Sequence, residues 1–294
     1  MATEAPEEKL AKKITDAMSL SAVAQQVAQL AGDINCSVAE LDKVISKDPA
    51  MSSKLIKMAN SSLFGFFKKS RNVSDAVTRL GLKQTRNLAY SFCVGNLVSG
   101  EKSAEGHEHE YSQFNVWCHS VAAGALNDLL AKHSGARELR KHSDAAFLTG
   151  LLHDIGVILA DQYKHKDYYS VPGMMTYLNQ SLPKVESRFL GFTHEDLGAR
   201  VLEKWKFPKE VVDAVQGHHS PGQHLDNPLT PLTGITEYVL ASNEFPGFHD
   251  VPADIPARGL EDIKFKLEII GEPFNEAIEE FWKTAPELMD IYLQ

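Results

Sequence analysis

Apolar residues recur at helical spacing along nearly the whole chain, and this periodicity limits the fold more than any other feature of the sequence. Met51, Leu55 and Met58 form one such stripe, because residues three and four apart lie on the same face of a helix. Start signals accompany the pattern: residues 37–40 have the form of a capping box, and Asp48 precedes a proline, as an N-cap residue would. Strand patterns are scarce. The sequence therefore predicts an all-α fold.

One polar segment interrupts the helical pattern. Residues 99–110 read SGEKSAEGHEHE, a glycine-containing acidic stretch without an apolar stripe. We place a boundary between two lobes here, with residues 1–100 forming an N-terminal helical lobe and residues 101–294 a second lobe with the C-terminal helices. Gly81 is expected to close a short helix with a positive φ. Helices are expected over residues 21–31, 73–80, 82–92, 114–132, 144–163, 174–190, 193–206, 209–217, 232–243, 260–270, 275–282 and 285–292.

Charge and cysteine content restrict the function classes. The formal net charge of -9 argues against direct binding to nucleic acid or to an anionic membrane, since both require a positive field. The apolar stretches are too short for a membrane span. Cys36, Cys93 and Cys118 are odd in number and have no CxxC spacing, so neither a disulfide framework nor a zinc knuckle is expected. These features fit a soluble protein of the reducing cytoplasm.

Six histidine and aspartate residues carry the chemical signal of the second lobe. They are His119, His153, Asp154, His194, His218 and His219. Zinc, iron and manganese sites use imidazole and carboxylate ligands gathered from several elements. His153 and Asp154 are adjacent in an apolar run, and a buried carboxylate without a cation or donor as partner costs on the order of several kcal/mol. If the six residues bind metal, they must converge in one cavity of the second lobe.

Each of these residues also has an ordinary structural explanation. His119 could be a core histidine bonded to a backbone carbonyl, and His153 with Asp154 could be a buried hydrogen-bonded pair without metal. His218 and His219 could end a helix, where a positively charged imidazole suits the negative end of the helix dipole. The residues alone leave both explanations open.

The order of these residues resembles a known pattern. His119 followed by His153 and Asp154 has the form of the first three elements of the HD phosphohydrolase signature, H…HD…D. The chain is similar to a relative of that family, the HDOD output domain, over residues 15–245. The phrases that carry the similarity are DP…L…aNS..fG over residues 45–65, A…LG over residues 76–81, and H..lG..L…W.lP…HH over residues 194–219. The resemblance implies a two-lobed helical HDOD fold with an HD-like helical core in the second lobe.

Departures from the pattern bear on activity. A catalytic HD enzyme closes its metal site with an aspartate on a later helix, and the matching position here falls on Ser242 or, with a shift of one residue, on Asn243. The related HD-GYP family consists of cyclic di-GMP phosphodiesterases. Its members carry a lysine where this chain has Val157, and a glycine-tyrosine-proline segment where this chain has Ser220-Pro-Gly. Loss of a ligand carboxylate and a cationic side chain removes two means of stabilising a phosphoester transition state. The resemblance therefore implies a degenerate phosphohydrolase site.

The function implied is that of a bacterial-type, non-catalytic signal-transduction module. Such a regulatory output domain acts through a signalling protein partner or a nucleotide ligand, without contacting nucleic acid or a membrane. The alternative is a metal-dependent phosphohydrolase or phosphodiesterase that acts on a nucleotide or phosphoester. Its cofactor would be a divalent transition metal, iron, manganese, zinc or nickel, held by the six residues given above.

We predict that the chain does not hydrolyse cyclic di-GMP even with metal added. Each missing group, the closing carboxylate and the lysine, is expected to lower the rate by a factor on the order of 100, as does removal of one stabilising donor. The measurement is cyclic di-GMP hydrolysis with Mn²⁺ or Fe²⁺ under anaerobic conditions, for the natural protein and for Ser242→Asp. Clear turnover by the natural protein contradicts the prediction.

Overall fold

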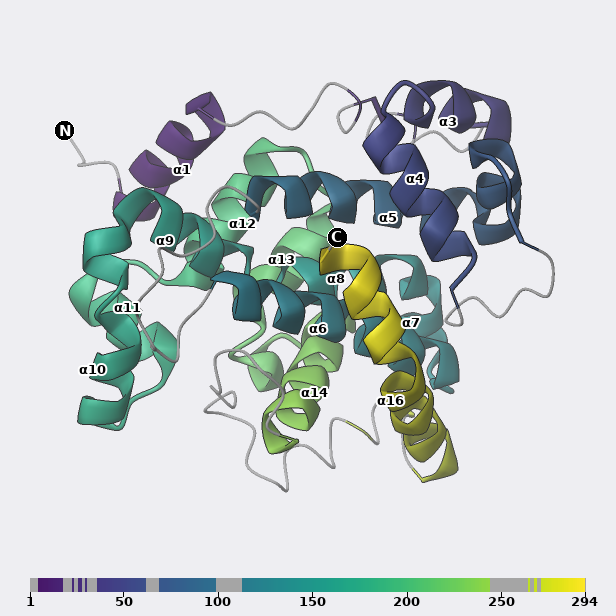
Figure 1. Cartoon of the computed structure of the whole chain (residues 1–294). Helices are drawn as coiled ribbons and strands as arrows, with labels where there is room; N and C mark the ends of the chain where they lie inside the picture. The colour runs from purple at the N-terminus through teal and green to yellow at the C-terminus, as the bar shows by residue number, and fades with distance from the viewer. Residues whose placement is uncertain are drawn as a thin grey trace. The chain divides into compact units, whose positions relative to one another are not determined.

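The structure is a computed structural model that describes residues 5–17, 23, 26–27, 30, 36–61, 69–98, 113–243, 264, 267–268 and 271–293. Within these ranges the regular elements are all helical and no strand occurs, so the all-α prediction is confirmed (Figure 1). None of the described helices is both long and apolar enough to cross a membrane.

The chain divides into two compact units. The unit that carries the predicted site, called the site unit below, comprises residues 1–19 and 101–278, and the second unit comprises residues 20–100 and 279–294. One change of unit falls after residue 100. At the N-terminal end, α1 (Pro6–Ala17) packs on α12 (His194–Lys204) and belongs to the site unit. Helix α16 (Glu272–Leu293) contributes residues to both units.

The second unit shows the local signals expected from its sequence. Helix α3 (Val38–Ile45) begins with the capping box of Ser37, and α4 (Pro49–Ala59) begins at Asp48, whose carboxylate accepts two backbone N–H groups at 3.0 Å. The stripe of Met51, Leu55 and Met58 is buried.

Gly81 interrupts α5 (Val73–Val98) with φ 78° and ψ 162°. The predicted positive φ is thus observed, and it lies inside this long element as a break between two helical stretches. A residue without Cβ adopts this conformation at little cost.

The site unit is built from helices that are buried on several sides. Its other elements are α6 (Gln113–His133), α7 (Arg137–Lys141), α8 (Ser143–Leu152), α9 (Ile155–Tyr168), α10 (Val171–Leu178), α11 (Leu182–Phe189), α13 (Lys209–Gly217), η2 (Pro221–Gln223) and α14 (Leu229–Ser242). Residues 116–131 of α6 are buried without interruption, as are residues 145–161 across α8 and α9. A helix that is apolar all round belongs in the centre of a core. The His153-Asp154 pair therefore joins two core helices.

Glycines allow these core helices to approach closely. A Cβ on Gly150 of α8 would lie 2.4 Å from the backbone oxygen of Ala123 in α6, and one on Gly124 would lie 2.9 Å from that of Phe147. A Cβ on Gly156 of α9 would lie 2.0 Å from the backbone oxygen of His194. Residues with larger side chains would force apart the helices that carry the predicted ligands.

Several expected helix boundaries differ from those observed. The helix expected over residues 144–163 is divided at residues 153–154, and that expected over residues 174–190 is the pair α10 and α11. The two helices expected within residues 275–292 are one continuous helix, α16. Helix α1 was not among the helices expected from the sequence. The helices expected over residues 21–31 and 260–270 lie largely outside the described residues.

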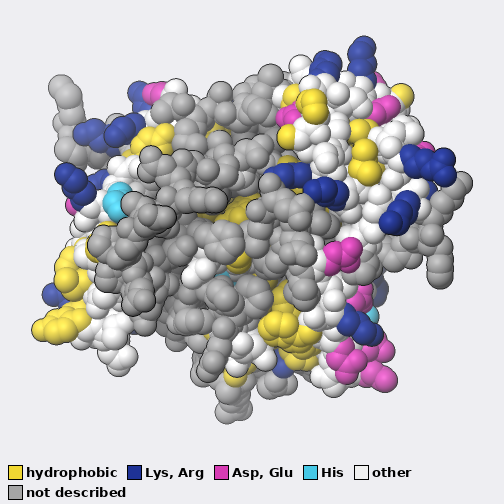
Figure 2. Space-filling model, viewed as in Figure 1, with side chains coloured by type: hydrophobic (Ala, Val, Ile, Leu, Met, Phe, Trp, Pro, Cys, Tyr) yellow, Lys and Arg dark blue, Asp and Glu magenta, His cyan; other side chains and the backbone are white. Residues whose placement is uncertain are grey.

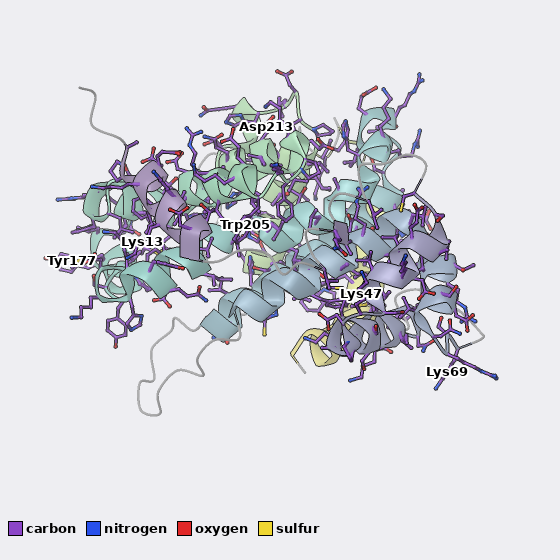
Figure 3. The ribbon with its side chains drawn as sticks, turned by 90° about the horizontal axis from the view of Figure 1, so that it is seen from above. Lys13, Lys47, Lys69, Tyr177, Trp205 and Asp213 are labelled. Carbon is purple, nitrogen blue, oxygen red and sulfur yellow. The ribbon has the colours of Figure 1, made fainter. Side chains whose placement is uncertain are left out.

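The hairpin of α10 and α11 presents apolar side chains to solvent. Tyr177 of α10 is 84% exposed and points away from the neighbouring helices (Figure 3), and Tyr169 and Phe189 at the hairpin's two ends are also exposed. Figure 2 shows hydrophobic side chains on this part of the surface. The inner side of α11 is different, because Val185 and Glu186 are fully buried.

The close approach of α9 and α12 predicts the effect of two glycine substitutions. Gly156→Ala should lower the free energy of unfolding by about 3 kcal/mol, because the added methyl group overlaps a backbone oxygen. Gly173→Ala is the matched control, since its Cβ would meet no atom within 4 Å and alanine favours a helix by up to about 1 kcal/mol. Urea denaturation measures both. Equal midpoints for the two variants would contradict the packing described.

Candidate metal centre

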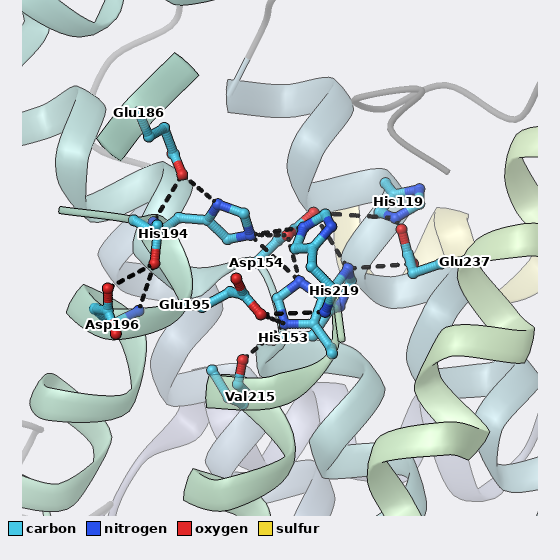
Figure 4. Close-up of polar contacts among 12 residues, drawn as sticks. His119, His153, Asp154, Glu186, His194, Glu195, Asp196, Val215, His219 and Glu237 are labelled. Carbon is cyan, nitrogen blue, oxygen red and sulfur yellow. Dashed lines mark hydrogen bonds and ion pairs between the residues drawn. The ribbon is translucent and has the colours of Figure 1, made fainter. Parts of the chain in front are cut away.

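The structure gathers all six predicted site residues into one buried cluster of the site unit (Figure 4). They come from five parts of the fold, and Glu237 of α14 joins them. His119 lies in α6, His153 ends α8, Asp154 precedes α9, His194 begins α12, and His218 and His219 follow α13. Their ligand atoms form two groups, each within 4.8 Å.

The first group, called the Glu237 group, consists of His119, His153 and Glu237. The Oε1 atom of Glu237 lies 2.9 Å from Nε2 of His119 and 3.2 Å from Nε2 of His153. All three side chains are at least nine-tenths buried. Two imidazoles and one carboxylate therefore converge from three different helices.

The second group, called the Asp154 group, consists of Asp154, His194, His218 and His219. The Nε2 atom of His194 lies 3.3 Å from Nε2 of His218 and 3.1 Å from Nε2 of His219. His194 and His218 are completely buried, and His219 is partly accessible. Three imidazole nitrogens thus lie around a common point.

Asp154 lies between the two groups and faces each with a different oxygen. Its Oδ2 atom is 3.2 Å from Nε2 of His153 and 4.0 Å from Nε2 of His119. Its Oδ1 atom is 3.5 Å from Nε2 of His194 and 3.7 Å from Nε2 of His218. This is the arrangement of a carboxylate that could bridge two ions, one in each group.

Backbone carbonyls fix the orientation of two of the histidines. Nδ1 of His153 donates to the Gly150 oxygen at 2.6 Å, and Nδ1 of His218 donates to the Val215 oxygen at 2.7 Å. Because a carbonyl only accepts, each Nδ1 carries a proton, and each ring directs its Nε2 atom into the cluster. Each carbonyl lies three residues before its histidine, so the helix end itself supplies the orienting group.

Glu186 orients His194. One of its carboxylate oxygens accepts from the backbone N–H of His194 at 2.8 Å and from Nδ1 of the same residue at 2.7 Å, while the other accepts from the Tyr168 hydroxyl at 2.6 Å. The Glu186 carboxylate is fully buried and lies beside the N-terminus of α12, where the helix dipole favours negative charge. A carboxylate that holds Nδ1 of a histidine is a common support for a metal ligand.

Glu195 holds the segment of the chain that follows α13. Its Oε1 atom accepts from the backbone N–H of His219 at 3.1 Å. This bond ties the paired histidines to α12, the helix that begins with His194.

The donor chemistry of the cluster fits a bound cation. With both Nδ1 atoms donating elsewhere, the Nε2 atoms of His194 and His218 face each other across 3.3 Å. The Nε2 atom of His153, although close to two carboxylates, has no hydrogen-bond partner. Buried polar atoms are rarely left without a partner. A metal ion or a proton between the Nε2 atoms of His194 and His218 would remove the repulsion between these two nitrogens.

The ionisable groups perturb one another strongly. Burial lowers the pKa of His194, but the Glu186 and Asp154 carboxylates raise it to about 9. Burial raises the pKa of Asp154, yet the neighbouring imidazoles of His153, His218 and His194 hold it well below its usual range. The pKa of Glu237 is lowered in the same way by His119 and His153, against the effect of burial. Both carboxylates are therefore ionised within the cluster.

His219 differs from the other histidines of the cluster. Burial and the neighbouring His218 and His194 rings lower its pKa well below the usual range, so the ring is neutral. Cys118, beside His119 in sequence, offers no thiolate, because burial raises its pKa to about 11.

The prediction that the closing position falls on Ser242 or Asn243 is wrong. Both residues are exposed at the end of α14, where the Asn243 side chain donates to the Val239 oxygen. The carboxylate that α14 brings to the cluster is Glu237, five residues before Ser242 on the same helix. The sequence contained a signal for it, since Glu237 is the single charged residue in the segment LTPLTGITEYVLAS, and a buried carboxylate requires a partner. The Ser242→Asp substitution would place no carboxylate in the cluster.

The helical fold and the paired histidine–carboxylate groups define an HD-like protein. The sequence profile of the HDOD domain matches residues 18–221. The chain therefore belongs to the HDOD domain family.

Solved structures share the fold. An HDOD domain protein of unknown function from Geobacter sulfurreducens has a TM-score of 0.75 at 17% identity, with 97% of each chain covered. A protein of Shewanella amazonensis SB2B, provisionally described as a phosphohydrolase, has a TM-score of 0.71 at 19% identity, with 96% of this chain and 97% of that one covered. A protein of Marinobacter aquaeolei VT8, provisionally described as a signal transduction protein, has a TM-score of 0.72 at 21% identity, covering all of this chain and 62% of that one. At these identities the likeness concerns the fold.

A curated relative is an uncharacterised protein of Treponema pallidum (strain Nichols). It is 24% identical over 211 residues, which are 72% of this chain and 39% of that protein. The chain therefore matches well under half the length of this relative.

The buried position of Asp154 predicts that it supports the fold. In metal-free protein, Asp154→Ala should lower the free energy of unfolding by about 3 kcal/mol, because its removal leaves buried imidazolium charge without a partner. Denaturant titration in the presence of a chelator measures the change. Asp213→Ala is the control, since its ion pair with Lys209 is exposed on α13 and should contribute less than about 1 kcal/mol. An unchanged midpoint for Asp154→Ala would exclude this supporting role.

Proposed function

We propose that this chain is a metal-dependent phosphohydrolase of the HDOD family whose site unit holds two divalent transition-metal ions. The observation that carries the proposal is the position of Asp154, with one carboxylate oxygen toward each ligand group. The Glu237 group would hold one ion and the Asp154 group the other. Glu237 supplies the carboxylate whose apparent absence favoured a non-catalytic function.

The residues of the two groups have separate tasks in this proposal. Bound in pairs, divalent ions activate a water molecule and stabilise the attacking and leaving oxygens of a phosphoester. Gly150 and Val215 hold His153 and His218 by their carbonyl groups, so that both rings present Nε2. Glu186 does the same for His194. The mixed imidazole and carboxylate set suits iron, manganese, zinc or nickel.

The substrate class is a phosphoester other than cyclic di-GMP. Val157 is fully buried in α9, at the position where the HD-GYP phosphodiesterases carry a lysine. Ser220 and Pro221 follow the paired histidines, where those enzymes have their glycine-tyrosine-proline segment. These two departures from the HD-GYP pattern do not depend on which residue of α14 supplies a carboxylate to the cluster.

A second candidate function is a regulatory output module in which the metal centre is structural. It is favoured by the burial of the ligands, since His153, His194 and His218 are 0% exposed. Ions enclosed in this way would hold the core helices together, and the module would act on a signalling protein partner or respond to a nucleotide.

Metal analysis tests the proposed centre. The purified chain reconstituted with Mn²⁺ should hold two ions, and Glu237→Gln should reduce this to one, because the amide brings no charge to the Glu237 group. Glu138→Gln is the matched control, since that carboxylate is exposed and pairs with Lys141 on α7. No bound Mn²⁺ in the natural protein would refute the two-ion proposal.

A hydrolysis screen separates the two candidate functions. The Mn²⁺-loaded chain is incubated with generic phosphodiester and phosphomonoester substrates, and Asp154→Asn serves as the inactive reference. Turnover that requires both ions supports the phosphohydrolase. Two bound ions without turnover on any substrate support the structural centre of a regulatory module.

A further inference from the structure

A buried carboxamide joins the three helices that supply the Glu237 group. Asn127 of α6 is completely buried. Its Nδ2 donates to the backbone oxygen of Ala146 in α8 at 3.2 Å and to the hydroxyl of Thr233 in α14 at 3.1 Å. Its Oδ1 accepts from the hydroxyl of Thr236 in α14 at 2.6 Å. One side chain thus bonds to two neighbouring helices.

The bonds of Asn127 are chemically complete and directional. Both Nδ2 hydrogens are used, and the oxygen has a donor. The Thr233 hydroxyl accepts from Asn127 while it donates to the backbone oxygen of Leu229 at 2.9 Å, so its hydrogen is already committed. A slide of α14 along its axis would break the two bonds that Asn127 makes with Thr233 and Thr236.

The same close contact positions His153. Gly150 of α8 permits the approach, since a Cβ there would lie 2.8 Å from Nδ2 of Asn127. The carbonyl of Gly150 is the group that holds the His153 ring. The Asn127 contacts therefore lie beside the carbonyl group that orients the His153 ring. Thr236, which also bonds to Asn127, directly precedes Glu237 in the chain.

We propose that Asn127 is a positioning residue that fixes α14 against α6 and α8 and so sets the geometry of the Glu237 group. This inference rests on the proposed two-ion centre for its metal readout. The Asp154 group is built differently: His194, His218 and His219 come from α12 and the end of α13, which Asn127 does not contact through any of the bonds described. Removal of the carboxamide should therefore disturb one group and spare the other.

The test uses the full chain with three variants. Asn127→Leu keeps a side chain of similar size and removes all three bonds. Thr236→Val removes one bond with little change in volume, and Thr236→Ser retains the hydroxyl and should restore the natural behaviour. Thr149→Val is the matched control, because that buried hydroxyl bonds only within α8, to the oxygen of Ala145.

The first readout is the ¹H–¹⁵N spectrum of the histidine rings in metal-free protein. Asn127→Leu and Thr236→Val should shift the signals of His119 and His153, and leave those of His194, His218 and His219 in place. Equal shifts in all five rings, or none, in a folded variant would overturn the inference. Thr236→Val decides the question if Asn127→Leu does not fold.

The second readout is Mn²⁺ binding. The affinity of one ion should fall by about 10- to 100-fold in Asn127→Leu, as for other residues that support metal ligands, while the second ion binds as before. Equal weakening of both ions would overturn the inference. If the natural protein binds no Mn²⁺, the proposed two-ion centre fails, and the metal-free spectra still decide the role of Asn127.

Discussion

The shared carboxylate of Asp154 is the interaction on which the rest of the site unit depends. A buried carboxylate is stable only with cations or donors around it, and here imidazoles of both ligand groups lie within 4.0 Å of its two oxygens. Its position between α8 and α9 divides an otherwise continuous apolar helix. Helices α6, α12 and α14 and the end of α13 each bring a side chain to the cluster around Asp154, so the packing of the site unit surrounds one buried negative charge with polar groups.

Close helix packing and ligand orientation use the same residues. Gly150 allows α6 and α8 to approach, and its carbonyl fixes His153. Gly156 gives α9 room beside the backbone of His194, the first residue of α12. Positions that look purely structural therefore also determine where the ring nitrogens lie. Helix α11 contributes in the same way, because its Glu186 orients the His194 ring. The opposite face of α11 is the exposed face of the hairpin formed with α10.

The sequence predicted what depends on local chemistry. The all-helical class, the capping residues Ser37 and Asp48, and the break at Gly81 all arise from interactions between near neighbours in the chain. The sequence also singled out the six residues that the structure gathers. Glu237 was missed because the HD signature was matched to a fixed later position, Ser242 or Asn243. Which residue of α14 faces His119 depends on how this helix packs against α6, and motif spacing does not determine that packing. Glu186 could not be anticipated, since its role exists only after α11 packs against the start of α12.

In the proposed two-ion centre, ion binding is coupled to the folding of the site unit. Without an ion, a proton between Nε2 of His194 and Nε2 of His218 would remove the repulsion between them, and the Glu186 and Asp154 carboxylates favour that proton because they raise the pKa of His194 to about 9. A metal ion competes with that proton for the same lone pairs. An ion that binds only the folded unit adds about 2.7 kcal/mol of stability at a free concentration 100 times its dissociation constant. The same ligand geometry can therefore serve an enzyme or a metal-stabilised regulatory module, and access of a phosphoester to the two ions is the property that distinguishes them.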